Sequence, residues 1–93
     1  MEPPAPPAYR VVLCEVTTGI VLARPGMYAW NVDAAAVARD FATVGEARAY
    51  AALIVAAHPD VECWIQHLDG APVERVYDGD GYRRWREARD RRQ

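Results

Sequence analysis

The sequence contains no lysine, little cysteine and no long apolar run. All 11 basic residues are arginine, and no apolar segment is long enough to cross a membrane. The chain also lacks the succession of basic, apolar and cleavage regions that marks a signal peptide. Two cysteines without a secretory signal favour reduced thiols over a disulfide framework. These absences argue against a membrane-spanning or disulfide-stabilised secreted class, and we expect a cytoplasmic protein with no membrane partner.

Large apolar side chains are also scarce. Hydrophobic residues make up 52% of the 93 residues, but 17 of them are alanine and only four are leucine. Residues 1–8 hold four prolines and no large apolar side chain after Met1, so they predict a disordered proline-rich tail. The remaining domain is near the lower limit of size that one core stabilises. We therefore expect aromatic packing or a second copy of the chain to contribute to its stability.

A capped helix is the strongest secondary-structure pattern in the chain. Thr43 and Glu46 match the Ser/Thr-x-x-Glu capping box, which predicts that a helix begins after Thr43. Pro59 cannot continue a helix, so the helix is predicted to end near Ala57 or His58. Apolar residues recur at helical spacing and predict one face packed on a core. These residues are Val44, Ala47, Ala51, Ile54 and Val55.

A β-hairpin is predicted before this helix. Tyr9 to Val16 and Ile20 to Ala23 are rich in β-branched residues, and Thr17-Thr18-Gly19 between them suits a three-residue loop. Pro25-Gly26 predicts a turn at the end of the second strand. The residues Met27 to Trp30 then extend that strand or form a third short one.

A second hairpin is predicted after the helix. It pairs Val61–Leu68 with Val73–Tyr77 around the turn signal Asp69-Gly70. Because side chains alternate along a strand, each strand has one face for the helix and one face that is open if nothing covers it. The helix face carries Val61, Cys63, Ile65 and Val76, and the opposite face carries Glu62, Trp64, Gln66, Arg75 and Tyr77.

The remaining segments complete the predicted architecture. Asp33 to Arg39 suggests a short helix or structured loop, and Asp80 to Arg92 suggests a short amphipathic helix. Asp78 to Gly81 lacks the spacing of a calcium or phosphate loop and is predicted to be a flexible connector. The fold class is therefore α+β: a small single domain with a β-β-α-β-β antiparallel sheet of four or five strands. One long helix packs on one face, and a short C-terminal helix follows. The chain divides into a tail over 1–8, an α+β domain over 9–79 and an arginine-rich helix over 80–93.

No group of residues is spaced for metal binding or catalysis. Cys63 and His67 lie four residues apart on one strand, about 13 Å, which is too far to share an ion. Cys14 and Cys63 are possible neighbours across the sheet, but two ligands do not close a metal site. Neither cysteine follows a helix N-terminus, and the carboxylates are scattered over a domain too small to enclose a substrate. We expect no metal, no cofactor and no enzyme activity, and whether the thiols have a redox role stays open.

One candidate site is an aromatic and arginine patch. Trp64, Arg75 and Tyr77 share the face of the second hairpin away from the helix, and this composition is favoured at protein interfaces. Two further aromatics, Tyr82 and Trp85, lie on one stripe of the C-terminal helix. Either this helix covers the patch, or the patch is open to a protein partner or to a second copy of the chain.

The other candidate site is the C-terminal arginine cluster. Residues 81–93 carry six arginines and two acids, a net charge of +4, whereas residues 1–80 carry five arginines and eleven acids, a net charge of −6. Basic residues interleaved with aromatics can contact phosphates and stack on bases, although the acidic body repels a polyanion. The possible nucleic-acid contacts are Arg83, Arg84, Arg86, Arg89, Arg91 and Arg92.

The central segment resembles a pattern seen in small bacterial proteins of unknown function. The residues that carry the resemblance are Phe41, Thr43, Glu46-Ala47, Tyr50-Ala51, Pro59, Glu62 to Ile65 and Asp69-Gly70. The resemblance supports the fold and implies no activity. We expect a small bacterial protein that acts without catalysis through a protein partner, as an adaptor, an immunity-type inhibitor or an accessory subunit. We expect it to act as a homodimer or in a complex with a larger protein. The alternative is a nucleic-acid-binding protein that uses the C-terminal helix.

Overall fold

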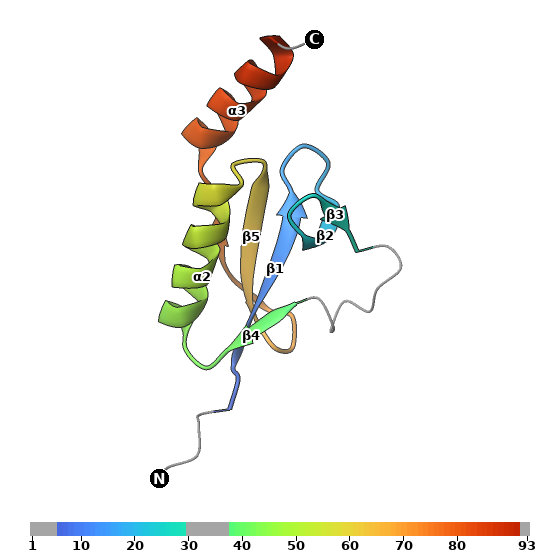
Figure 1. Ribbon diagram of the computed structural model, residues 1–93. Coiled ribbons are helices and arrows are strands. Elements are labelled where there is room, and N and C mark those ends of the chain that lie inside the picture. Colours follow the sequence, from blue (N-terminus) through green and yellow to red (C-terminus); the bar gives the residue numbers. More distant parts are fainter. Residues whose placement is uncertain (1–5, 30–37, 92–93) are drawn as a thin grey trace.

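The computed structural model describes residues 6–29 and 38–91, which form an antiparallel sheet and two helices (Figure 1). The α+β fold predicted from the sequence is confirmed. In chain order the elements are β1 (Tyr9–Glu15), β2 (Val21–Arg24), β3 (Met27–Tyr28), β4 (Arg39–Phe41), α2 (Val44–Ala57), β5 (Val61–His67), β6 (Pro72–Val76) and α3 (Gly79–Arg91).

The central strand of the sheet is β1. The strand order is β3-β2-β1-β5-β6, and every pairing is antiparallel. The edge of β1 away from β5 is shared, because β4 pairs with its first residues and β2 pairs with Leu13 and Cys14. Val12 lies between these two pairings and is paired with β5 through Trp64.

Strand β4 was not predicted from the sequence. The described residues form six strands, not four or five, because Arg39 to Phe41 pairs with β1. The helix or loop predicted over Asp33 to Arg39 falls mainly on 33–37, outside the described residues, and Arg39 itself begins β4. Three residues are too few for an alternating pattern to stand out, so only the pairing with β1 identifies this strand.

The turns follow the predicted chemistry. Gly19, Gly26 and Gly70 have φ angles of 74°, 82° and 97°, a left-handed conformation that glycine adopts without a steric penalty. In the second hairpin, Asp69 Oδ1 also accepts a hydrogen bond of 2.9 Å from the Ala71 N–H. These two features set the register of β5 and β6, in which Trp64 lies opposite Arg75 and Cys63 opposite Val76.

The helix α2 begins and ends where its capping residues predict. The Thr43 hydroxyl accepts a hydrogen bond of 3.1 Å from the Glu46 N–H, and the His58 N–H closes the last turn on the Ile54 carbonyl. The buried face of the helix consists of Ala47, Ala51 and Val55. Two alanines on this face let the helix axis lie close to the sheet.

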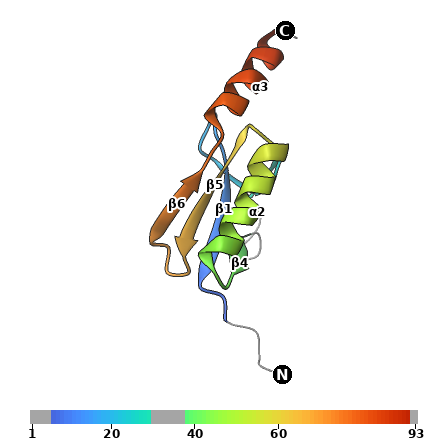
Figure 2. The ribbon, with the colours of Figure 1, turned by 90° about the vertical axis from the view of Figure 1, so that its left-hand side faces the viewer.

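The core lies between α2 and one face of the sheet. Its strand residues are fully or almost fully buried, and aromatic side chains close one end of it, where Phe41 packs on Tyr50 at 5.2 Å between ring centroids. In Figures 1 and 2, α2 covers this face, and α3 extends past the end of the sheet instead of crossing the other face. The strand residues of this core are Val11, Leu13, Leu22, Val61, Cys63 and Ile65.

The direction of α3 is set by a capping contact directly after β6. Asp78 Oδ1 accepts a hydrogen bond of 3.0 Å from the Gly81 N–H, and Tyr82 N–H donates to the Asp78 carbonyl. Gly81 is buried, and a Cβ placed there would lie 2.5 Å from the Asp78 carboxylate. The segment predicted to be a flexible connector is therefore the cap and first turn of the helix. No helix within the described ranges is both long and apolar enough to span a bilayer.

We expect Asp78→Ala to destabilise α3 by about 1 kcal/mol, because the first turn loses its capping acceptor. The effect is read as faster amide hydrogen exchange in α3, with α2 as the internal reference. Asp80→Ala is the matched control, because this carboxylate is exposed and pairs only with Arg83 within the described part of the chain. Equal exchange rates in the two variants would show that the cap does not hold the helix.

Candidate interaction surface

The sheet face opposite α2 carries the predicted patch. Trp64 and Arg75 lie directly across from each other on β5 and β6, as the alternation predicts. The Arg75 guanidinium carbon is 5.7 Å from the centroid of the Trp64 ring and 4.4 Å from that of Tyr77. Both distances suit cation–π contacts, so one guanidinium lies between two aromatic rings.

Glu62 holds this group in place. It is the one buried charged residue among the described residues, with 8% of its surface exposed. Its Oε1 accepts a hydrogen bond of 3.1 Å from Trp64 Nε1. Its Oε2 accepts two hydrogen bonds from the Arg75 guanidinium, one from Nε at 2.8 Å and one from an Nη atom. A single carboxylate therefore fixes the orientation of both the indole and the guanidinium.

The sequence placed Glu62 on this face but did not assign it to the site. Its partner Arg75 is a diagonal neighbour across the hairpin, within reach of long side chains. The sequence did contain a signal for this role. Glu62 lies two residues before Trp64 on the same face, and Arg75 lies opposite Trp64, so the acid is within reach of both side chains.

The patch continues from the sheet onto α3. The rings of Tyr77 and Tyr82 are 6.2 Å apart, and those of Tyr82 and Trp85 are stacked at 5.9 Å. Arg89 lies over Trp85 at 5.3 Å. The structure thus joins the five predicted patch residues and Arg89 in one row. We call it the aromatic–arginine row, and it consists of Trp64, Arg75, Tyr77, Tyr82, Trp85 and Arg89.

The helix α3 extends this row and does not cover its sheet end. Trp64 is 37% exposed, and the side chain of Arg75 is 43% exposed. The sequence left open whether the helix covers the patch or leaves it open, and these contacts and exposures correspond to an open patch that the helix extends. Exposed tryptophan and arginine side chains with fixed geometry are the residue types that dominate binding energies at protein interfaces.

The arginines of α3 are mostly exposed and weakly engaged. Arg83 pairs with Asp80 at 3.1 Å, a surface pair of small energetic value, and Arg89 contacts the Trp85 ring. Within the described residues, Arg84, Arg86 and Arg91 have no carboxylate partner, and Arg92 lies outside those residues.

A notch separates α3 from the loop between β1 and β2. The Thr17 and Tyr82 hydroxyls are hydrogen-bonded at 3.0 Å and bridge it at the base of the helix. Further along, the positive charge of Arg89 lowers the pKa of Tyr28. The hydrogen bond from Tyr28 to Glu15 outweighs this effect, so the pKa of Tyr28 is raised overall. The open part of the notch has a volume of about 250 Å³ and is lined by Thr17, Tyr82, Trp85, Arg86, Arg89 and Asp90.

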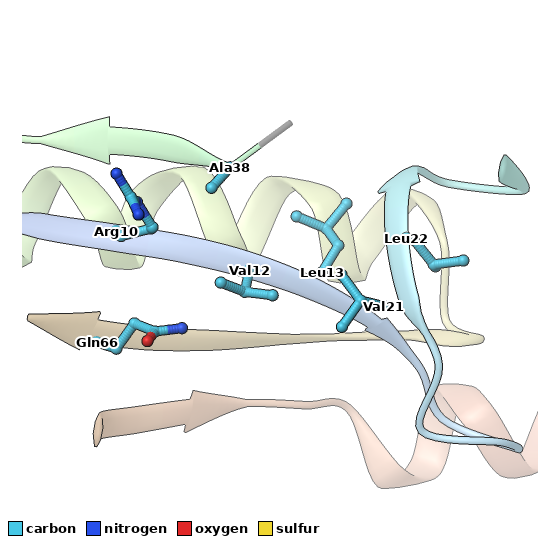
Figure 3. A pocket seen from close by; sticks show the side chains of 7 residues that line it. All are labelled: Arg10, Val12, Leu13, Val21, Leu22, Ala38 and Gln66. Atoms are coloured by element: carbon cyan, nitrogen blue, oxygen red, sulfur yellow. The ribbon is translucent and has the colours of Figure 1, made fainter. Parts of the chain in front are cut away.

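A second hollow, of about 180 Å³, lies in the gap between β2 and β4 (Figure 3). Figure 3 shows Arg10 and Gln66 at one end and apolar side chains, among them Val21 and Leu22, at the other. Arg10 makes two hydrogen bonds to Asp40, of 2.8 and 3.2 Å, which lower the pKa of that carboxyl. The guanidinium is thus engaged within the protein, and the rest of the lining is apolar apart from Gln66.

The two cysteines do not form a pair. Cys63 faces the core, with its sulfur 3.9 Å from the Ala51 carbonyl oxygen. Cys14 pairs with Val21 and with Glu62, and it therefore faces the opposite side of the sheet. Both thiols are free and buried. Burial is the main factor that raises the pKa of Cys63, to about 12, and burial together with the Glu62 charge raises that of Cys14. The described residues contain no cluster of three or more potential metal ligands.

We expect the stability to fall above pH 9 because of these thiols. In the unfolded chain they ionise near the reference value of 9.0, whereas the folded Cys63 stays neutral up to about pH 12. The stabilising contribution is therefore complete below pH 9 and is lost between pH 9 and 12, at about 1.4 kcal/mol per pH unit for one thiol. Urea unfolding at pH 8 and pH 10 measures it. Cys63→Ala should lose less stability between these two pH values than the wild type, and an equal loss would contradict this explanation.

Comparison with protein-family models, curated proteins and solved structures finds no match to this chain. The argument for function therefore rests on the geometry of the residues described above.

Proposed function

We propose that this protein is a non-catalytic interaction module that binds a protein partner through the sheet end of the aromatic–arginine row. The observation that supports it is the buried carboxylate of Glu62, which orients Trp64 and Arg75 on an exposed face. Burying a charged group is costly unless it is fully hydrogen-bonded. Here the buried carboxylate fixes two exposed side chains that contribute little to the core.

Preorganisation is the physical advantage of this arrangement for binding. Side chains that are fixed before association lose little conformational entropy on contact, and tryptophan and arginine supply the largest energies at interfaces. Adaptor, inhibitor and accessory-subunit roles all fit such a surface, because each requires a rigid contact patch and no reactive group.

The experiment that tests the proposal is Trp64→Ala. We expect the variant to bind its partner, or a second copy of itself, about 30-fold more weakly, as is typical for loss of a central tryptophan. The domain should stay folded, because Trp64 lies outside the core, with the free energy of unfolding lowered by about 1–3 kcal/mol through the lost hydrogen bond to the buried Glu62 carboxylate. Leu53→Ala is the control: Leu53 is 73% exposed on α2, and its removal should leave binding unchanged. Wild-type affinity in Trp64→Ala would reject the proposal.

The second candidate is binding of single-stranded nucleic acid by α3. What favours it is that α3 extends away from the acidic body and carries arginines without carboxylate partners beside two aromatic rings (Figure 1). Fluorescence anisotropy with labelled DNA and RNA tests it. This candidate expects affinity that falls steeply with salt and is lost in Arg84→Glu/Arg86→Glu. No binding at low salt would eliminate it.

A further inference from the structure

The notch between α3 and the loop that follows β1 has two hydroxyl groups at its base. This loop and the start of α3 lie at the same end of the sheet (Figure 1). The hydroxyls belong to Thr17 and Tyr82 and are hydrogen-bonded to each other at 3.0 Å. One hydrogen is enough for this bond, so the hydroxyl that accepts it keeps its own hydrogen for a further acceptor. The base of the notch therefore offers one O–H donor to a ligand.

Two guanidinium groups line the same notch. Arg86 and Arg89 lie three residues apart on α3, a spacing that places them on one side of the helix. Neither has a carboxylate within ion-pair distance among the described residues. The Arg89 guanidinium lies 5.3 Å from the centroid of the Trp85 ring, in a cation–π contact that uses none of its N–H donors. Both arginines can therefore donate hydrogen bonds to a ligand.

Two carboxylates belong to the surroundings of these donors. Asp90 lines the notch, so the lining carries two positive charges and one negative charge. Glu15 lies on the strand side, where its carboxylate accepts hydrogen bonds from the hydroxyls of Thr18 and Tyr28. Within the part of the chain that the structure describes, neither acid is within ion-pair distance of the two arginines. The lining is left with one excess positive charge and with more donors than acceptors.

We propose that the notch binds the phosphoryl group of a phosphomonoester. Such a group carries a charge of about −1.5 to −2 at pH 7 and three strong acceptor oxygens. Two guanidinium groups from one side and a hydroxyl from the base can each donate to a different oxygen. A carboxylate has only two oxygens, both in one plane, and suits three donors from different elements less well.

This site is separate from the surface around Trp64, so the inference goes beyond the proposed function. It also differs from the nucleic-acid candidate, which depends on Arg84. Helical spacing places Arg84 on the side of α3 opposite Arg86, and it does not line the notch. The phosphomonoester can belong to a small molecule or to a phosphorylated side chain of another protein, and the choice of probes distinguishes these two sources.

NMR titration of the full-length chain at constant ionic strength tests the assignment. The probes are phenyl phosphate, a short phosphoserine peptide, the same peptide without the phosphate, and inorganic phosphate. Both monoesters should shift the signals of Thr17, Tyr82 and the Trp85 indole in a saturable way, and the unphosphorylated peptide should not. Tighter binding of the peptide would identify a protein as the source, and tighter binding of phenyl phosphate a small molecule. Binding of inorganic phosphate without binding of either monoester would overturn the inference.

Four single substitutions on α3 show whether the lining of the notch is responsible. Arg89→Gln should weaken monoester binding about 10-fold or more, because a charge-assisted hydrogen bond is lost. Arg84→Gln changes the charge equally outside the lining and should leave the affinity unchanged. Asp90→Asn should tighten binding, because it removes the carboxylate that lines the notch, whereas Glu87→Gln, outside the lining, should not.

The outcomes that contradict the site are equally specific. No saturable response to either monoester, equal losses in Arg89→Gln and Arg84→Gln, or an unchanged affinity in Asp90→Asn would each overturn the inference. All of these results leave the proposed function standing, because that proposal is tested by Trp64→Ala, whose position does not line the notch.

Discussion

Replacing Ile65 by alanine should lower the free energy of unfolding by about 2–5 kcal/mol. Ile65 is fully buried at the centre of the sheet, where it pairs with Val11 and belongs to the core beneath α2. The core contains few large side chains, and the helix contributes mainly alanines to it. Neighbours this small cannot fill the space left by a missing isoleucine. Since a domain of this size has about 5 kcal/mol of total stability, this loss removes a large part of it, and at the upper end of the range the variant is largely unfolded at 37 °C.

The matched control for this substitution is Leu53→Ala. Leu53 is a comparable aliphatic residue on α2 but is 73% exposed, so its replacement should change the free energy of unfolding by less than about 0.5 kcal/mol. Urea unfolding followed by circular dichroism measures both variants. Similar losses in the two would mean that the face of α2 assigned to the core is not the buried one.

Replacing Glu62 by alanine should have the second largest effect, on stability and binding together. The substitution removes the acceptor of Trp64 Nε1 and of Arg75, at about 1–3 kcal/mol for charge-assisted hydrogen bonds. The lower half of that range is expected, because Arg75 is 43% exposed and water replaces part of what it loses. Partner affinity should fall as it does in Trp64→Ala, although no contacting side chain has been removed.

The control for Glu62 is Glu74→Ala. Glu74 also pairs with an arginine, Arg48, at 3.0 Å, but this pair is exposed and lies on the α2 side of the sheet. We expect a loss of about 0–1 kcal/mol and unchanged binding. If Glu62→Ala lost stability but bound its partner normally, Glu62 would be a structural residue and would not position the row.

The parts of the fold that the sequence predicted correctly depend on local chemistry. Thr43 and Pro59 bound the helix, the glycine turns set the hairpins, and strand alternation placed Trp64 and Arg75 together. Each of these signals lies within a few residues of the structure that it specifies. The α+β class follows from them because a β-β-α-β-β order with tight hairpins has few ways to pack one helix.

The parts that were missed depend on contacts between distant residues. Strand β4 is defined by its pairing with β1, about 30 positions earlier in the chain, and no local pattern marks it. The direction of α3 depends on Asp78 acting as a cap, whereas the alternating Asp and Gly residues of this segment suggested a flexible link. The continuity of the row from Tyr77 to Tyr82 follows from that direction and could not be predicted without it.

The central claim is that the exposed face around Trp64 binds protein, and affinity capture from a lysate of the source organism tests it most directly. The immobilised wild type and Trp64→Ala are each exposed to lysate with and without nuclease treatment. We predict that the wild type retains one protein, either another chain or this one, at near-equal stoichiometry in both lysates, and that Trp64→Ala does not retain it. Material retained equally by Trp64→Ala, or material that disappears with nuclease, would contradict the account.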